Sequence, residues 1–160
     1  MLKDIIKKRT IFQSHKNWFV LDDEFTWKLP LLHQQVFSCL ETYLDVPIIF
    51  CDTCEANKIV SELGEEEGEY LQFAAGLYWR EVGIIFIFQF DDYLSLVETI
   101  FHELRHVMQE SIPSLQFQFE HDKKLPYEKR LTEIDAFQFA SNLLNSFTNS
   151  FLDNSLHSLQ

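Results

Sequence analysis

The chain of 160 residues carries 25 acidic and 13 basic side chains, which give it a formal net charge of −12. A surface with this excess of negative charge repels a phosphate backbone, so the composition argues against DNA or RNA as a partner. Hydrophobic residues make up 46% of the sequence and aromatic residues 15%, with 4 Gly and 4 Pro, which excludes a disordered or fibrous chain. The length suits a single domain, residues 1–160, and no apolar run approaches the roughly 20 residues that a membrane-spanning helix needs.

The cysteines and the first residues predict a reducing location. The sequence has three Cys, and residues 1–20 lack the unbroken apolar segment of a secretion signal, so we expect a cytoplasmic protein. Cys51 and Cys54 have the CxxC spacing of zinc knuckles and redox sites. Because no second CxxC pair exists, we interpret them as cysteines at the end of a strand. Residues 1–10 are basic and weakly amphipathic, which fits either a short helix or a flexible docking arm.

The first half of the sequence alternates between helical and β patterns. A helix is expected over residues 31–44, because apolar side chains recur there at every fourth position. Residues 46–50 are apolar and rich in β-branched side chains, which predicts a buried strand. The glycines and glutamates of residues 64–69 break this periodicity and predict a solvated loop. The β-rich runs 70–79 and 83–90 then predict a hairpin.

Two strongly periodic helices follow the hairpin. The first begins near Asp91 or Asp92, either of which can cap its first turn, and Pro113 lies beyond its end. The second follows Pro126, with an expected apolar side formed by Leu131, Ile134, Phe137, Ala140, Leu144 and Phe147. Residues 148–160 are rich in Ser and Asn and predict a flexible tail. We therefore predict an α+β fold, in which a small sheet of about three strands, including the hairpin, packs against these two helices.

The first of these helices contains an HExxH motif formed by His102, Glu103 and His106. Residues four apart lie on the same face of a helix, so both histidines can bind one tetrahedral metal ion while Glu103 projects beside them. The two histidines lie opposite the apolar stripe, which predicts that they line a cleft. We predict a zinc site with His102 and His106 as ligands and Glu103 as the catalytic general base.

A third ligand is expected on the second helix, because catalytic zinc sites usually have three protein ligands. Glu133 is favoured, since it projects from the side of that helix that we expect to be buried, and a buried carboxylate needs a partner. It shares this stripe with Ala136, Phe137 and Ala140. Asp135, on a more polar face, and His121 are the alternatives. Without a metal, Glu133 would be a buried carboxylate paired with Arg105 or Arg130.

These motifs resemble those of the gluzincin-type zinc metallopeptidases, and among small ones those of the ImmA/IrrE-like and related minimal bacterial families. Such proteins have HExxH on one helix and Glu-x-x-Ala on a second, often followed by Phe-Ala. Here Glu133 and Ala136 match the second motif, and Phe139 and Ala140 follow it. The resemblance covers roughly residues 83–144 and implies a zinc metallopeptidase, with Zn²⁺ as cofactor and a peptide or protein as substrate.

Three protein ligands leave a fourth zinc position for water, so the expected reaction is hydrolysis of a peptide bond, with Glu103 accepting the water proton. Four side chains are candidates to stabilise the oxyanion, with Tyr127 slightly favoured over the others, Arg105, Arg130 and His121. The strand in residues 83–90 would bind an extended peptide if it lies at an edge of the sheet.

The main alternative is a non-catalytic zinc-binding or regulatory domain, in which His121 or a cysteine closes the fourth position. A further alternative is a metal-free module that binds a partner through a surface rich in Phe.

Overall fold

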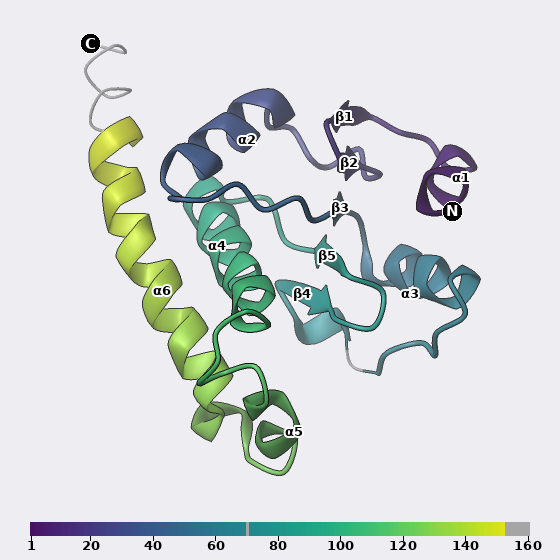
Figure 1. Ribbon diagram of the computed structural model, residues 1–160. Coiled ribbons are helices and arrows are strands. Elements are labelled where there is room, and N and C mark those ends of the chain that lie inside the picture. The colour runs from purple at the N-terminus through teal and green to yellow at the C-terminus, as the bar shows by residue number, and fades with distance from the viewer. Residues whose placement is uncertain (70, 153–160) are drawn as a thin grey trace.

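The computed structural model describes residues 1–69 and 71–152, which form a mixed sheet with helices on both faces (Figure 1). The sheet has five strands in the order β1-β2-β3-β5-β4. The bounds of β1 to β5 are Gln13–His15, Trp18–Val20, Ile48–Phe50, Gly76–Trp79 and Ile84–Ile87. The three middle strands run parallel, whereas β1 and β4 pair antiparallel with their neighbours. The described residues thus form an α+β fold.

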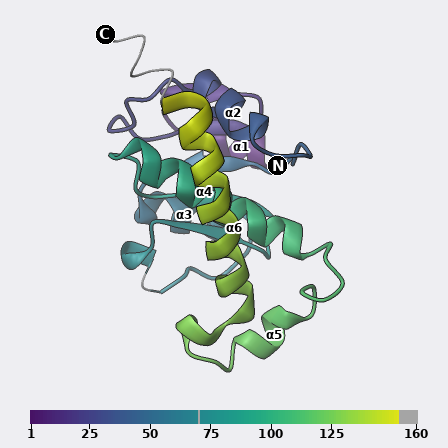
Figure 2. The same ribbon diagram turned by 90° about the vertical axis from the view of Figure 1, so that its left-hand side faces the viewer.

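The described part of the chain has six α-helices. The bounds of α1 to α6 are Leu2–Lys7, Leu29–Ser38, Thr53–Glu62, Tyr93–Gln109, Gln118–Asp122 and Leu131–Phe147. The shorter turns η1, η2 and η3 span Leu71–Phe73, Tyr127–Lys129 and Thr148–Leu152. Helices α2, α4 and α6 contribute to the core on one face of the sheet, and α1 and α3 to the core on the other. Figure 2 shows α6 crossing the outer side of α4, against which it packs.

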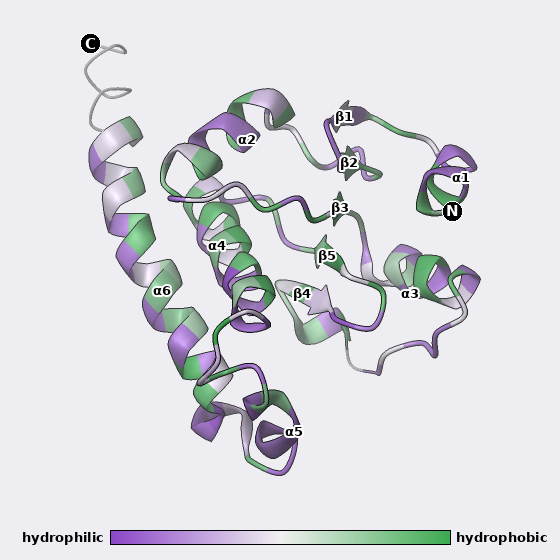
Figure 3. Cartoon of the chain, viewed as in Figure 1, coloured by the Kyte–Doolittle hydropathy of each residue, from purple (hydrophilic) through white to green (hydrophobic). Residues whose placement is uncertain are grey.

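Alternating side chains of the central strands divide the interior into these two cores. Ile48 and Phe50 of β3 point towards α2 and α4, whereas Ile49 points towards α1 and α3. Strand β5 alternates in the same way and is buried on both faces, as expected for a central parallel strand. In Figure 3 β3 and β5 are hydrophobic, and the partly exposed strand β4 is paler.

The predicted hairpin is confirmed as β4 and β5, and the predicted strand over residues 46–50 as β3. The sheet is larger than predicted, because the pattern of the sequence does not reveal β1 and β2. The helix expected over residues 31–44 is α2, which ends at Ser38. Strand β5 lies between β3 and β4, so the expectation that residues 83–90 offer an edge to a peptide is wrong. The strand at this edge is β4.

Helix α4 forms as its sequence predicts. Asp92 is its N-cap, and the carboxylate accepts a hydrogen bond of 2.9 Å from the backbone N–H of Ser95. Its apolar stripe packs against the sheet through buried side chains of Leu96, Val97, Ile100, Phe101 and Leu104. This packing fixes the rotation of the helix about its axis and directs the face with the HExxH motif towards β4.

Helix α6 begins with a cap supplied from another element. The buried carboxylate of Asp122, at the end of α5, accepts hydrogen bonds from the backbone N–H of Thr132 at 3.0 Å and from its hydroxyl at 2.5 Å. These bonds outweigh the effect of burial and lower the pKa of Asp122. Because Thr132 precedes Glu133, this cap holds the start of α6 where Glu133 faces α4.

The apolar side expected for α6 is only partly correct. Ala136 and Ala140 are fully buried, as is Phe147. The small alanines let the two helices approach each other closely. Three larger residues of the expected apolar side are instead exposed to solvent, namely Leu131, Ile134 and Phe137.

The structure describes the N-terminal segment of the chain but only part of the predicted C-terminal tail. Residues 2–7 form α1, which packs through the buried side chains of Ile5 and Ile6. Residues 153–160, most of the predicted tail, lie outside the described residues. Among the helices of the described part, none is long and apolar enough to cross a membrane.

Candidate metal centre

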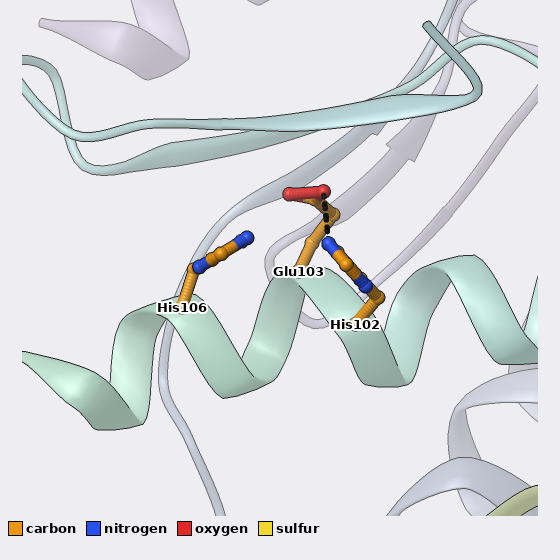
Figure 4. Close-up of side chains that lie close together, drawn as sticks. All are labelled: His102, Glu103 and His106. Carbon is orange, nitrogen blue, oxygen red and sulfur yellow. Dashed lines mark ion pairs between the residues drawn. The ribbon is translucent and has the colours of Figure 1, made fainter. Parts of the chain in front are cut away.

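Helix α4 brings three side chains of the HExxH motif together beneath β4 (Figure 4). His102, Glu103 and His106 are all buried. Each offers one potential ligand atom, and these atoms lie within 4.8 Å of one another. The Nε2 atom of His102 is 4.0 Å from the Oε1 atom of Glu103. Among the described residues, this is the one group of three or more His, Cys, Asp or Glu side chains that could hold a metal ion.

Helix α6 adds Glu133 to this group. One oxygen of its carboxylate lies 2.9 Å from Nε2 of His102, and the other lies 2.9 Å from Nε2 of His106. The hydroxyl of Tyr127, on η2, donates a hydrogen bond of 2.6 Å to the same carboxylate. Glu133 is therefore next to both histidines, as helical phase predicts, and it is not paired with either of the arginines considered as alternatives.

The charges and hydrogen bonds of this group shift the pKa values of His106 and Glu133 strongly. Burial alone would lower the pKa of His106, but the hydrogen bond to Glu133 and the negative charges of Glu103 and Glu133 raise it to about 9. Burial would raise the pKa of Glu133, but hydrogen bonds from both histidines and from Tyr127 hold it well below its usual range. In the metal-free protein, a proton of His106 thus occupies the space between its ring and the carboxylate of Glu133.

Glu103 is held by the edge strand. The backbone N–H of Tyr78, on β4, donates a hydrogen bond of 2.8 Å to Oε2 of Glu103. Full burial raises the pKa of Glu103, while the neighbouring histidines and this hydrogen bond act in the opposite direction. The strand can approach this closely because residue 76 is Gly: a Cβ there would lie 2.7 Å from Cγ2 of Thr99 on α4.

A network that the sequence analysis missed supports His106 from behind. Gln109 is fully buried, and its Oε1 lies 2.9 Å from Nδ1 of His106. Its Nε2 donates to the backbone carbonyl of Thr132 at 2.8 Å and to Asp135 at 2.9 Å. Since the amide nitrogen needs those two acceptors, its oxygen faces the imidazole, which places a proton on Nδ1. The spacing of Gln109 from His106, three residues along a helix, was the available signal.

The alternative ligands lie elsewhere. Asp135 makes a bidentate ion pair with Arg105, at 2.7 and 3.1 Å. His121 is exposed on α5 and lies outside the group described above. Cys51 is buried and Cys54 is exposed, both as free thiols. Burial raises the pKa of the Cys51 thiol well above its ordinary value, which suppresses thiolate formation.

A cleft runs along β4 past this group, formed by two adjoining cavities. The cavity beside His102 has a volume of about 740 Å³, and the one beside His106 has a volume of about 700 Å³. Both are lined by Glu103 and Tyr127. Tyr127 is half exposed, so the cleft is open to solvent where the two cavities meet.

The donor atoms fit a divalent metal ion. A tetrahedral zinc ion with bonds of about 2.0–2.2 Å places its ligand atoms roughly 3.3 Å apart. The carboxylate oxygens of Glu133 and the imidazole Nε2 atoms of His102 and His106 are already 2.9 Å apart. Each histidine is therefore close to the required spacing from one oxygen of Glu133. Two imidazoles and one carboxylate form a set of nitrogen and oxygen donors typical of such sites.

A comparison with protein-family models finds one match, over residues 20–150, to a family described as "Protein of unknown function (DUF3920)". The match includes α4 and α6, and therefore every residue of the candidate metal centre. No curated protein and no solved structure matches the chain.

Proposed function

The chain belongs to the DUF3920 family, whose description assigns no activity, and we propose that it is a zinc-dependent metallopeptidase. The observation that carries this proposal is the placement of Glu133 against both Nε2 atoms of His102 and His106, with Glu103 beside them in an open cleft. His102, His106 and Glu133 would hold the ion. The ion supplies Lewis acidity, which acidifies a water molecule and polarises a substrate carbonyl.

Glu103 is the general base of the proposed reaction. Its carboxylate accepts a proton from the attacking water and later donates it to the leaving amine. The hydrogen bond from the N–H of Tyr78 fixes one oxygen of this carboxylate and leaves the other, Oε1, facing His102. A raised pKa suits this double role, because a base that returns its proton works best when its pKa lies near the working pH.

Tyr127 is the proposed hydrogen-bond donor to the oxyanion. Its hydroxyl lies 2.6 Å from Glu133 and its ring lines both cavities, so the hydroxyl is within the cleft and close to the proposed ligands. Burial and the hydrogen bond to Glu133 raise the pKa of Tyr127, which keeps the hydroxyl protonated as a donor. The other candidates are less suitable, because Arg105 is bound to Asp135 and Arg130 donates to the carbonyl of Leu125.

The side chains around the group favour a catalytic zinc site over a structural one. A structural zinc site has four protein ligands, whereas a catalytic site keeps one position open. Among the described residues, neither His121 nor a cysteine joins the group, and the cleft reaches Glu103 from both sides.

Metal analysis of untagged protein tests the site. We expect about one zinc ion per chain, and we expect His102→Ala and His106→Ala to remove it, since each loses one of three ligands. His121→Ala is the matched control, an exposed histidine outside the group, and should retain the ion. Full zinc occupancy in both active-site variants would refute the assignment.

Hydrolysis is tested separately with zinc-loaded protein and a mixture of unstructured peptides. Glu103→Gln should retain zinc and abolish cleavage, because an amide cannot accept the proton of water. The amide oxygen can still accept the hydrogen bond from Tyr78, so the fold is preserved. Cleavage by Glu103→Gln at the wild-type rate would exclude Glu103 as the base.

A further inference from the structure

The two halves of the cleft differ in chemistry. We call the cavity beside His102 the apolar half, because two aromatic rings, Phe73 and Phe137, form part of its wall. We call the cavity beside His106 the charged half, because basic and acidic side chains line it, among them Arg80, Glu81, Glu120, Asp122, Lys123, Arg130 and Glu133. Glu103 and Tyr127 line both halves and mark the division between them. A peptide bound across Glu103 would therefore have its residues on one side of Glu103 in an apolar cavity and those on the other side in a charged cavity.

The aromatic rings of the apolar half come from opposite sides of the cleft. Phe73 lies on η1, before β4, and is 78% exposed, whereas Phe137 lies on α6 and is 51% exposed. The ring of Phe137 packs edge-on against that of His102, with centroids 4.5 Å apart. This contact places an apolar surface directly beside a proposed zinc ligand. Burial of such exposed rings against an apolar side chain of a substrate is favourable.

Charge in the apolar half selects against acidic substrates. Its ionisable lining groups are Glu98, His102, Glu103 and Tyr127, and no lysine or arginine of the described residues lines it. An acidic side chain in this half would face the like charges of Glu98 and Glu103 with no lysine or arginine in the lining to pair with, and would lose its hydration. The volume of about 740 Å³ lies within the range of ligand-binding cavities and accommodates a large side chain with its adjoining backbone.

We propose that the apolar half is a specificity subsite, which binds a bulky aromatic or aliphatic side chain next to the scissile bond and rejects an acidic one. The inference rests on the proposed peptidase function and adds the class of substrate. The occupant is an extended peptide, because the half adjoins β4, whose outer edge is not paired with another strand of the described sheet. Phe73 and Phe137 are the residues that determine the preference.

Peptide binding tests the subsite without requiring hydrolysis. The probes are fluorescein-labelled peptides of Ala, Gly and Ser with one central residue varied among Phe, Leu, Ser, Asp and Lys. Their binding to zinc-loaded Glu103→Gln protein is followed by fluorescence anisotropy. We expect the Phe and Leu peptides to bind about 10- to 100-fold more tightly than the Asp peptide. Adding Phe73→Ala or Phe137→Ala should reduce this preference about tenfold.

Two matched controls separate the subsite from general surface hydrophobicity. Phe117 has an exposed fraction of 77%, nearly that of Phe73, but lines neither half, and Ile134 is exposed one turn before Phe137 on α6. Phe117→Ala and Ile134→Ala should leave the preference unchanged. Zinc content is measured for Phe137→Ala, because its ring touches His102. Phe73 lies on η1 and not on either helix that carries the proposed ligands, so Phe73→Ala tests the subsite independently of metal loss.

The outcomes distinguish this inference from the proposed function. Equal binding of all five peptides, tighter binding of the Asp peptide, or no binding of any peptide would overturn the subsite. Wild-type cleavage of all five at one rate would also overturn it while leaving the peptidase intact. Apolar-selective binding that depends on Phe73, without cleavage by the wild-type chain, would support the subsite and refute the peptidase.

Discussion

Replacement of Gln109 by Leu should weaken zinc binding through His106 rather than through loss of a ligand. The amide oxygen of Gln109 lies 2.9 Å from Nδ1 of His106, opposite the nitrogen that faces Glu133. This acceptor fixes the orientation and tautomer of the ring, and loss of such a partner typically costs about 10- to 100-fold in metal affinity. Leu fills a similar volume but offers no acceptor.

The same substitution should also destabilise the metal-free fold. Gln109 is fully buried, and its nitrogen satisfies the carbonyl of Thr132, which would lose its partner. A buried acceptor without a partner costs about 1–3 kcal/mol. Asp135 is affected less, because it retains its ion pair with Arg105. We therefore expect a loss of about 1–3 kcal/mol in the free energy of unfolding measured with EDTA.

Two assays separate these effects. Competition with a chromophoric chelator gives the Kd for zinc, and urea unfolding in EDTA gives the metal-free stability. Gln109→Glu is the informative partner variant, since it keeps an oxygen near His106 but directs a second oxygen at the carbonyl of Thr132 and the carboxylate of Asp135. It should lose stability as Gln109→Leu does, with a smaller loss of zinc affinity. Unchanged zinc affinity in Gln109→Leu, together with reduced stability, would refute the positioning role and leave Gln109 as a packing residue.

Three further predictions concern the same site. Glu133→Ala should abolish tight zinc binding, whereas Asp135→Ala should weaken it by about tenfold. Chelator competition measures both affinities, and the reverse order would contradict the assignment of Glu133. The pKa of His106 is raised by folding from 6.5 to about 9, so its contribution to the stability of the metal-free protein is complete below pH 6.5 and is lost as the pH rises through 9. The expected loss of unfolding free energy is about 3 kcal/mol, which urea titrations in EDTA can measure. Equal stability at pH 6.5 and pH 9.5 would contradict this shift. Gly76→Ala should push β4 away from Thr99 and destabilise the fold by about 1–3 kcal/mol in thermal unfolding, whereas an unchanged Tm would mean that the strand adjusts freely.

The parts of the fold with strong periodicity were predictable from the sequence. Helix α4 has both an N-cap at Asp92 and an apolar stripe, so its position and the direction of the HExxH face follow from local physics. Strands β1 and β2 were not predictable, because each has three residues and gains its stability from pairing with its neighbour, β1 with β2 and β2 with β3, rather than from its own pattern. Helix α3 is likewise short, and its buried residues Ala56, Ile59 and Val60 give a weak stripe.

In the candidate site, too, some features were predictable from the sequence and others were not. Spacing alone placed His102, Glu103 and His106 on one face, and helical phase placed Glu133 towards them. The exposure of Phe137 was not predictable, because it depends on the tertiary arrangement in which Ala136 and Ala140 are buried while the ring of Phe137 lies against His102 in the cleft. Gln109 was missed because glutamine is common on exposed helix faces, and its burial depends on Thr132 and Asp135 of a distant segment.

The hydrogen bond between Glu103 and β4 also bears on the solubility of the chain. An unpaired sheet edge exposes N–H groups to which strands of other molecules can add, and proteins cover or charge such edges to prevent aggregation. Here the carboxylate of Glu103 satisfies the N–H of Tyr78 on the outer side of β4. The proposed base therefore shields part of this edge from other chains. Glu103→Ala would remove that acceptor, so loss of activity in that variant would be accompanied by self-association, whereas Glu103→Gln keeps the edge covered.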